Sequence, residues 1–301
     1  MKSLLLGSSL LIASSPVFAG LRIVTTTEDL AALAREVGGK HVKVESIAKG
    51  YQDPHFVDAK PSYLLKLKRA DLFIQVGLEL ESSWAPNLLR SARNKKIRPG
   101  ARGFLDASSG CDVLDKNADA DRSQGDVHPE GNPHYWLDPA NGRIIAKNIA
   151  GRLSELDPDH TQDYKANLAA FEVSLKEKIA GWDKLAQAFK GSKVVTYHNS
   201  WPNFAKRFHL NVIDFVEPKP GIPASPSHIK ALLERIRREK ITLIFMEPYF
   251  DEKLPKKIAS DTGANLLILP PSVGAAKGIK TYSDLFDHNL NLLSDALGKK
   301  Q

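Results

Sequence analysis

Short β-rich runs alternate with helical patterns along this chain, and one long helical segment divides the alternation into two halves. The predicted strands before that segment are residues 21–27, 42–47 and 72–77, with helices at 28–37 and 61–69. The predicted strands after it are residues 193–197, 212–216, 243–246 and 266–269, with helices at 226–238, 253–262 and 282–297. Such alternation is typical of parallel sheets with crossover helices. We therefore predict an α/β fold of two lobes, each with a mainly parallel sheet flanked by helices.

The segment between the halves has the pattern of one long α-helix. Asp157 and Pro158 supply a start signal, and Gly191 supplies a stop. Apolar side chains recur between them at spacings of three and four, at Tyr164, Leu168, Phe171, Leu175, Ile179, Trp182, Leu185 and Phe189. A helix of roughly 30 residues is about 45 Å long. We predict that residues 156–190 connect an N-terminal lobe, 20–155, to a C-terminal lobe, 191–301, and limit hinge closure between them.

Residues 1–19 have the pattern of a cleaved secretory signal. Lys2 precedes an apolar run at 4–12, and Val17-Phe18-Ala19 forms a small-residue cleavage site. No later run reaches roughly 18 consecutive apolar residues, so direct membrane insertion is not expected. The one cysteine, Cys111, cannot form an intramolecular disulfide, and no cysteine stands directly after the predicted cleavage site to carry a lipid anchor. These features predict an exported protein of a bacterial periplasm, with a monomer as the default state.

Charge and composition exclude some partners. The chain has 42 Lys and Arg against 35 Asp and Glu, a formal charge of +7 that is spread along its length. Basic runs such as residues 235–238 fit the solvated face of a helix, so nucleic-acid binding is not expected. Acidic residues and glycines gather without periodicity at 108–133. We predict a mobile, acidic surface loop there.

Three of the nine histidines lie where a ligand can reach them. His55 follows a predicted strand within a turn, His134 lies in a loop, and His198 ends a predicted strand. In open α/β sheets, ligands bind beyond the carboxyl ends of the strands. Three imidazoles from separate loops form most of a tetrahedral zinc shell. Because the three are far apart in sequence, the residues alone leave hydrogen-bonded structural histidines as the alternative.

Five segments carry a family resemblance. They are Asp-Pro-His-Phe-Val-Asp-Ala-Lys-Pro-Ser at 53–62, Ala-Asp-Leu-Phe-Ile at 70–74, Asn-Pro-His-Tyr-Trp-Leu-Asp-Pro at 132–139, Tyr-His-Asn-Ser-Trp at 197–201 and Ile-Phe-Met-Glu-Pro-Tyr-Phe at 244–250. With these segments in order, the chain resembles the zinc/manganese-type solute-binding proteins of ABC importers. The resemblance implies that His55, His134 and His198 bind one divalent metal between the lobes.

The fourth ligand departs from the family pattern. The family often places a carboxylate near the strand end that here spans residues 267–272, but the matching position holds Pro270 or Pro271. Proline offers no side-chain donor atom. The candidates that remain are a water, which we favour, Glu247, and the loop residues Asp126, His128 and Glu130. Three imidazoles without a carboxylate favour zinc over manganese.

The function that follows is capture of a divalent metal, expected to be zinc, and its delivery to a membrane ABC permease with its ATPase. On this interpretation the chain is not an enzyme. The alternative is a zinc-dependent hydrolase or hydratase, because three histidines with a bound water also form a catalytic site. No general base or nucleophile motif accompanies the three histidine segments. A weak second metal site in the 108–133 loop is a further alternative to a plain solvated loop.

Overall fold

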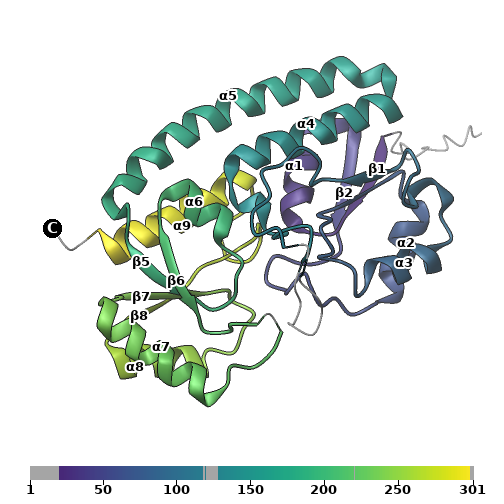
Figure 1. Cartoon of the computed structure of the whole chain (residues 1–301). Helices are drawn as coiled ribbons and strands as arrows, with labels where there is room; N and C mark the ends of the chain where they lie inside the picture. Colours follow the sequence, from purple (N-terminus) through teal and green to yellow (C-terminus); the bar gives the residue numbers. More distant parts are fainter. Residues whose placement is uncertain (1–19, 118, 120–127, 220, 299–301) are drawn as a thin grey trace, which may run out of the picture.

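The computed structural model describes residues 20–117, 119, 128–219 and 221–298. The predicted signal, residues 1–19, lies outside the described residues, as do residues 118 and 120–127 of the predicted acidic loop. The described chain forms two parallel sheets of four strands, each covered by helices (Figure 1). The predicted fold class is therefore confirmed.

The N-terminal lobe is built on the first sheet. Its strands are β1 (Leu21–Thr25), β2 (Val42–Ser46), β3 (Leu72–Gln75) and β4 (Phe104–Asp106). Their order is β2-β1-β3-β4, and each neighbouring pair is parallel. Its helices are α1 (Glu28–Gly38), α2 (Pro61–Arg69), α3 (Ala85–Ala92) and α4 (Pro139–Leu156). Helices cover both faces of the sheet, so consecutive residues of the central strand β3 are buried and apolar.

The C-terminal lobe repeats this architecture. Its strands are β5 (Lys193–Thr196), β6 (Asn211–Phe215), β7 (Leu243–Met246) and β8 (Asn265–Ile268), in the parallel order β6-β5-β7-β8. Its helices are α6 (Pro202–Phe208), α7 (Pro226–Glu239), α8 (Lys253–Thr262) and α9 (Tyr282–Leu297). Across the whole described chain, single 3₁₀ turns are η1 (Gly39–His41), η2 (Lys95–Ile97), η4 (Tyr135–Leu137), η5 (Pro158–His160) and η6 (Gln187–Phe189).

The long helix α5 (Thr161–Ala186) runs along both lobes (Figure 1). It packs on α1 and α4 at one end and on α9 at the other. Asn167 donates to the backbone carbonyl of Val37 in α1 at 2.9 Å, and Lys178 pairs with Asp287 of α9 at 2.6 Å. The α-helix is shorter than the predicted 156–190, because a 3₁₀ turn flanks it at each end.

Four elements were not predicted: β4, α3, α4 and α6. Strand β4 has only three residues, and so short a segment shows no recognisable strand pattern in the sequence. Helix α4 lies against both α1 and α5, and its buried residues include Asn141 and Gly142 beside its apolar ones. Ile145, Ile149 and Leu153 follow one another at helical spacing, and Asp138 caps the start of the helix, so the sequence did carry a helix signal here that the prediction did not use.

The two lobes share one hydrophobic core. A single cluster of buried side chains contains Leu33 of α1, Ile149 of α4, Phe171 of α5 and Phe286 of α9. The lobes are therefore packed on common helices rather than joined by a flexible linker. Among the described residues, no helix is long and apolar enough to cross a membrane.

Candidate metal centre

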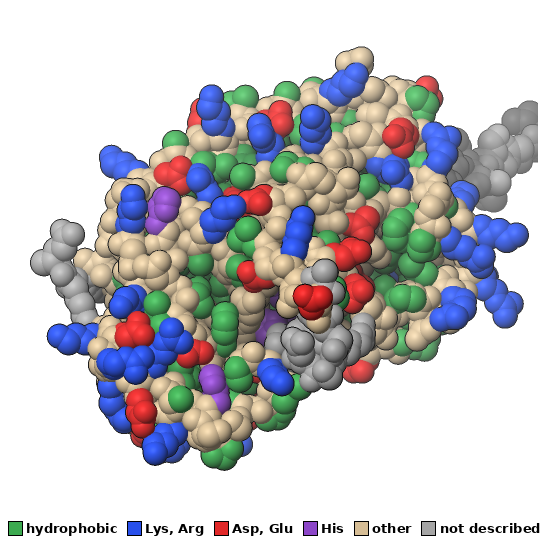
Figure 2. Space-filling model, viewed as in Figure 1, with side chains coloured by type: hydrophobic (Ala, Val, Ile, Leu, Met, Phe, Trp, Pro, Cys, Tyr) green, Lys and Arg blue, Asp and Glu red, His purple; other side chains and the backbone are tan. Residues whose placement is uncertain are grey.

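His55, His134 and His198 meet between the lobes, although up to 143 positions separate them in sequence. One ligand nitrogen from each lies within 4.8 Å of the others, and all three side chains are buried. The ring centroids are 5.2 to 5.6 Å apart. Figure 2 shows histidine surface at the bottom of a hollow between the lobes. The structure thus brings together the three histidines that the sequence singled out.

His55 lies in the loop after β2 and is held by Asp53. Oδ1 of Asp53 accepts hydrogen bonds from the His55 backbone nitrogen at 3.0 Å and from His55 Nδ1 at 2.7 Å. The same turn is anchored to the next loop of the sheet, because Ser83 Oγ donates to the His55 carbonyl and Trp84 Nε1 donates to the Pro54 carbonyl. These bonds fix both the backbone and the ring of His55.

His134 is held in the same way by Asn132. Oδ1 of Asn132 accepts from the His134 backbone nitrogen and from His134 Nδ1, each at 3.0 Å. The amide nitrogen of Asn132 donates to the Asn199 carbonyl at 2.7 Å, which connects this turn to the C-terminal lobe. The motifs Asp-Pro-His at 53–55 and Asn-Pro-His at 132–134 are therefore one structural device used twice. A short polar side chain closes the turn and also orients the ring two residues later.

His198 follows β5 and faces the carboxylate of Glu217, which follows the neighbouring strand β6. Its Nδ1 lies 3.3 Å from Glu217 Oε1, in the segment after β6. The same oxygen accepts from the Gly221 backbone nitrogen at 2.7 Å, and Thr196 Oγ1 donates to the His198 carbonyl at 2.9 Å. Glu217 thus orients His198 as Asp53 orients His55.

These partners set the tautomer of each imidazole. Because an oxygen acceptor faces Nδ1 of all three rings, Nδ1 carries the proton and Nε2 is left with its lone pair. Nε2 of His55 and Nε2 of His134 are buried and have no hydrogen-bond partner among the described residues. Buried polar atoms are almost always satisfied, so these two nitrogens indicate a ligand that accepts a lone pair. The arrangement fits a metal ion.

The electrostatics keep His134 neutral. Burial, followed by the charges that His55, His198 and His128 can carry, holds the pKa of His134 well below its usual value. Burial alone would also lower the pKa of His198, but the hydrogen bond to Glu217 and the nearby carboxylates of Glu247 and Asp53 raise it. Protons therefore compete with a metal more strongly at His198 than at His134.

The structure separates the candidates for a fourth ligand. The carbonyls of Pro270 and Pro271 accept from Asn289 Nδ2 at 2.7 Å and from Trp136 Nε1 at 2.9 Å. Glu247 is buried, which raises its pKa to about 7, and its Oε1 accepts from Trp201 Nε1 at 2.9 Å. Glu247 does not belong to the group of His55, His134 and His198, whose ligand atoms lie within 4.8 Å of one another.

The three loop candidates differ from one another. Glu130 is exposed, and Asp126 lies outside the described residues. The His128 ring lies 5.5 Å from the His55 ring, centroid to centroid. His128 is therefore the loop candidate that the structure places beside one of the three histidines, His55.

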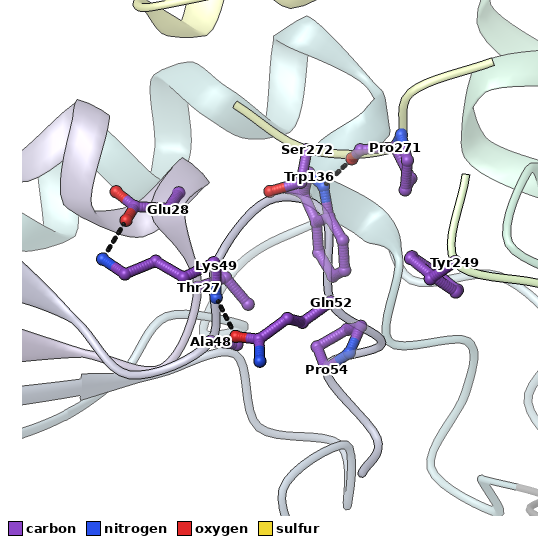
Figure 3. Close-up of a pocket in the computed structure, with 10 residues that line it drawn as sticks. All are labelled: Thr27, Glu28, Ala48, Lys49, Gln52, Pro54, Trp136, Tyr249, Pro271 and Ser272. Atoms are coloured by element: carbon purple, nitrogen blue, oxygen red, sulfur yellow. Dashed lines mark hydrogen bonds and ion pairs between the residues drawn. The ribbon is translucent and has the colours of Figure 1, made fainter. Parts of the chain in front are cut away.

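A narrow crevice beside the centre shows how tightly the lobes meet there. Its walls come from both lobes and include Pro54, Trp136, Tyr249 and Pro271 (Figure 3). The Trp136 ring also lies 5.3 Å from the His134 ring and shields it from solvent. The hydrogen bond from Trp136 to the Pro271 carbonyl ties the His134 segment to the C-terminal lobe.

Sequence reasoning missed the three orienting residues, Asp53, Asn132 and Glu217. The repeated pattern of Asp or Asn, then Pro, then His was a visible signal for the first two. Glu217 gave no such signal, because it approaches His198 only through the pairing of β5 with β6.

The chain is similar to known proteins over nearly its whole length. Residues 23–296 match the family model described as zinc-uptake complex component A, periplasmic, or ZnuA. The metal ABC transporter substrate-binding lipoprotein ScbA of Streptococcus cristatus is 29% identical over 292 residues, which cover 93% of this chain and 89% of the relative. The manganese ABC transporter substrate-binding lipoprotein PsaA of Streptococcus pneumoniae has the same identity and coverage.

Solved structures show the same fold. A zinc-bound deletion mutant of ZnuA superposes with a TM-score of 0.79 at 25% identity, over 94% of this chain and 100% of that chain. The laminin-binding protein Lbp of Streptococcus pyogenes superposes with a TM-score of 0.74 at 27% identity, over 92% of this chain and 99% of that chain.

Proposed function

Because this chain belongs to the ZnuA family, the periplasmic component A of zinc-uptake complexes, we propose that it captures zinc in the periplasm and delivers it to an ABC permease. It is a metal-binding solute-binding protein of ABC importers and not an enzyme. The metal is its cargo. The permease, with its ATPase, is the partner that receives the metal.

The donor set supports zinc over manganese. His55, His134 and His198 form the group of potential ligands, and no carboxylate belongs to that group among the described residues. Imidazole nitrogen suits zinc, whereas manganese favours carboxylate and water oxygens. The family model is named for zinc uptake, whereas some relatives are named for manganese. We therefore base the choice of zinc over manganese on the donor set of this chain, which contains only nitrogen atoms.

The same geometry suits a carrier that binds without large motion. Asp53, Asn132 and Glu217 hold the three rings in place before a metal arrives, so little ordering opposes binding. Helix α5 and the shared core hold the lobes together. We infer that metal binding draws the loop side chains together and leaves the relative position of the lobes unchanged.

The zinc hydrolase alternative lacks support. Membership of a solute-binding family argues against it. Glu247, the acidic residue directly after β7, lies outside the histidine group, and its Oε1 accepts from Trp201.

Metal content and competition test the proposal. Chelator-stripped protein is loaded with zinc, challenged with excess manganese, and compared with His134→Ala. His209→Asn is the control, because His209 is exposed and asparagine tolerates its φ of 56°. We expect one zinc per chain, lost in His134→Ala, kept in His209→Asn and not displaced by manganese. Equal retention of manganese would overturn the zinc assignment, and no stoichiometric metal would overturn the site.

A further inference from the structure

We propose that His128 is the fourth metal ligand, so that four imidazoles hold the zinc. This inference rests on the proposed function, because it concerns the same bound ion. It replaces the water that the sequence favoured with a side chain of the protein.

The His128 ring lies beside the ring of His55. Its centroid is 5.5 Å from that of His55, the same distance that separates His55 from His198. Both ring nitrogens of His128 are shielded from solvent. The ring is also near enough to His134 for a positive charge on it to lower the pKa of His134.

The backbone around His128 is held by described contacts. The Gly131 nitrogen donates to the His128 carbonyl at 2.9 Å, which closes a turn directly before the Asn-Pro-His motif. Asn117 donates to the Pro129 carbonyl at 3.1 Å, and Asn132 donates to the Leu114 carbonyl at 2.8 Å. This turn places His128 beside the site through the segment that also orients His134.

Glycine is required at position 131 of this turn. Gly131 has a φ of 119°, which other residues rarely adopt. A Cβ atom at that position would overlap a methyl group of Val113. The turn that presents His128 is therefore specified by the sequence and is not a chance arrangement of a surface loop.

Completing the shell requires the His128 ring to move toward the other three rings. In a tetrahedral zinc site with bonds of about 2.0 Å, ligand nitrogens lie about 3.3 Å apart. The three central histidines have ligand atoms within 4.8 Å of one another, and His128 does not belong to that group. All four side chains therefore draw inward around the ion, and His128 moves furthest.

Four imidazoles explain two properties of a zinc carrier. A closed four-coordinate shell leaves no open position for a reactive water, whereas catalytic zinc sites keep such a position. An all-nitrogen shell also discriminates against manganese, because it supplies none of the oxygen ligands that manganese favours. His128 would thus determine both the inertness and the specificity of the site.

Nitrogen NMR of ¹⁵N-histidine-labelled protein counts the metal-bound imidazoles directly. Chelator-stripped protein is titrated with one equivalent of zinc, and ring nitrogens that bind metal shift on binding. We expect four bound imidazoles in the wild type and three in His128→Ala. Zinc affinity, measured by chelator competition, should fall at least about tenfold in the variant, because loss of even an outer partner has that effect.

Two variants complete the design. His209→Asn is the matched control, since it removes an exposed histidine that is no ligand candidate and should leave the count of metal-bound imidazoles and the affinity unchanged. His128→Gln repeats the test with a larger side chain, and thermal unfolding of the metal-free proteins shows whether the variants fold. Three bound imidazoles in the wild type, or unchanged affinity in both folded His128 variants, would overturn the role of His128 while the proposed function stands. No stoichiometric zinc in the wild type would instead overturn the proposed function itself.

Discussion

Oδ1 of Asp53 holds His55 at two points, because it accepts from the backbone nitrogen at 3.0 Å and from the ring Nδ1 at 2.7 Å. A similar pair stands on the surface, where Asp163 lies 2.6 Å from His41 Nε2. The two pairs differ in position: His55 faces the other histidines, and His41 lies beside the N-terminal end of α5.

The Asp53 pair predicts the effect of removing one charge. Asp53→Asn keeps an oxygen acceptor but removes the negative charge that makes His55 a stronger ligand. We expect zinc affinity to fall by about 10-fold to 100-fold, the usual effect of losing such a partner. Asp163→Asn removes the matching charge from the surface pair and should leave affinity unchanged. Equal affinities for Asp53→Asn and wild type in chelator competition would contradict this role.

Zinc affinity should depend on pH. Only a neutral imidazole binds the ion, and the carboxylates near His198 hold the pKa of that ring above its usual value against the effect of burial. Protons therefore displace zinc as pH falls from 7.5 to 5.5, by about tenfold per pH unit for each imidazole that must lose a proton. Isothermal titration across this range measures the change. A constant affinity would be incompatible with a histidine site.

Asp29 should make the stability of the metal-free protein depend on pH. Its carboxyl is fully buried, accepts from Ser272 Oγ and the Val273 nitrogen, and has a pKa raised to about 7, chiefly by burial. Between about pH 4 and 7 the folded state holds a proton that the unfolded state releases, so this group's contribution to stability falls as pH rises.

Asp29→Asn does not titrate and should lose that pH dependence. At 1.36 kcal/mol per pKa unit, its unfolding free energy should rise relative to wild type by up to about 4 kcal/mol between pH 4 and pH 8. Denaturant unfolding at both pH values measures this difference. Asp58→Asn, at an exposed position of the same lobe, is the control. A difference that does not change with pH would show that Asp29 is not protonated in the folded state.

The contact between α4 and α9 should not tolerate a larger side chain. A Cβ atom at Gly142 would overlap the buried ring of Tyr282, whose hydroxyl donates to the Trp136 carbonyl. Gly142→Ala should therefore lower the unfolding free energy by about 1 to 3 kcal/mol. Gly151→Ala lies on the same helix with open space around it, and should be neutral or stabilising by up to about 1 kcal/mol. Thermal unfolding of both variants checks the contrast.

Binding should leave the overall shape unchanged. Helix α5 contacts α1 and α4 of one lobe and α9 of the other, and the four helices share one core. Small-angle scattering of the metal-free and zinc-loaded protein should give superimposable profiles. A decrease in the radius of gyration on adding zinc, of the kind that hinge closure produces, would show that the lobes move.

The sequence predicted those strands and helices whose apolar residues follow a regular spacing. The strands β1, β3, β5 and β7 and the amphipathic helices α1, α7 and α9 show their apolar spacing in the sequence itself, because each buries one face or one run of residues. Strand β4 escaped prediction because three residues are too few to show a pattern, whereas α4 was missed although Ile145, Ile149 and Leu153 recur at helical spacing.

The site shows the same division. The sequence by itself determined the α/β fold class, the long helix and the histidines His55, His134 and His198, since their strand-end positions bring them to the facing edges of two parallel sheets. Only the tertiary structure decided which groups orient those rings and which lie beside them. Glu217 reaches His198 through strand pairing, and His128 reaches His55 through a turn that depends on Gly131. These contacts join residues from separate elements, so packing of the whole chain determines them.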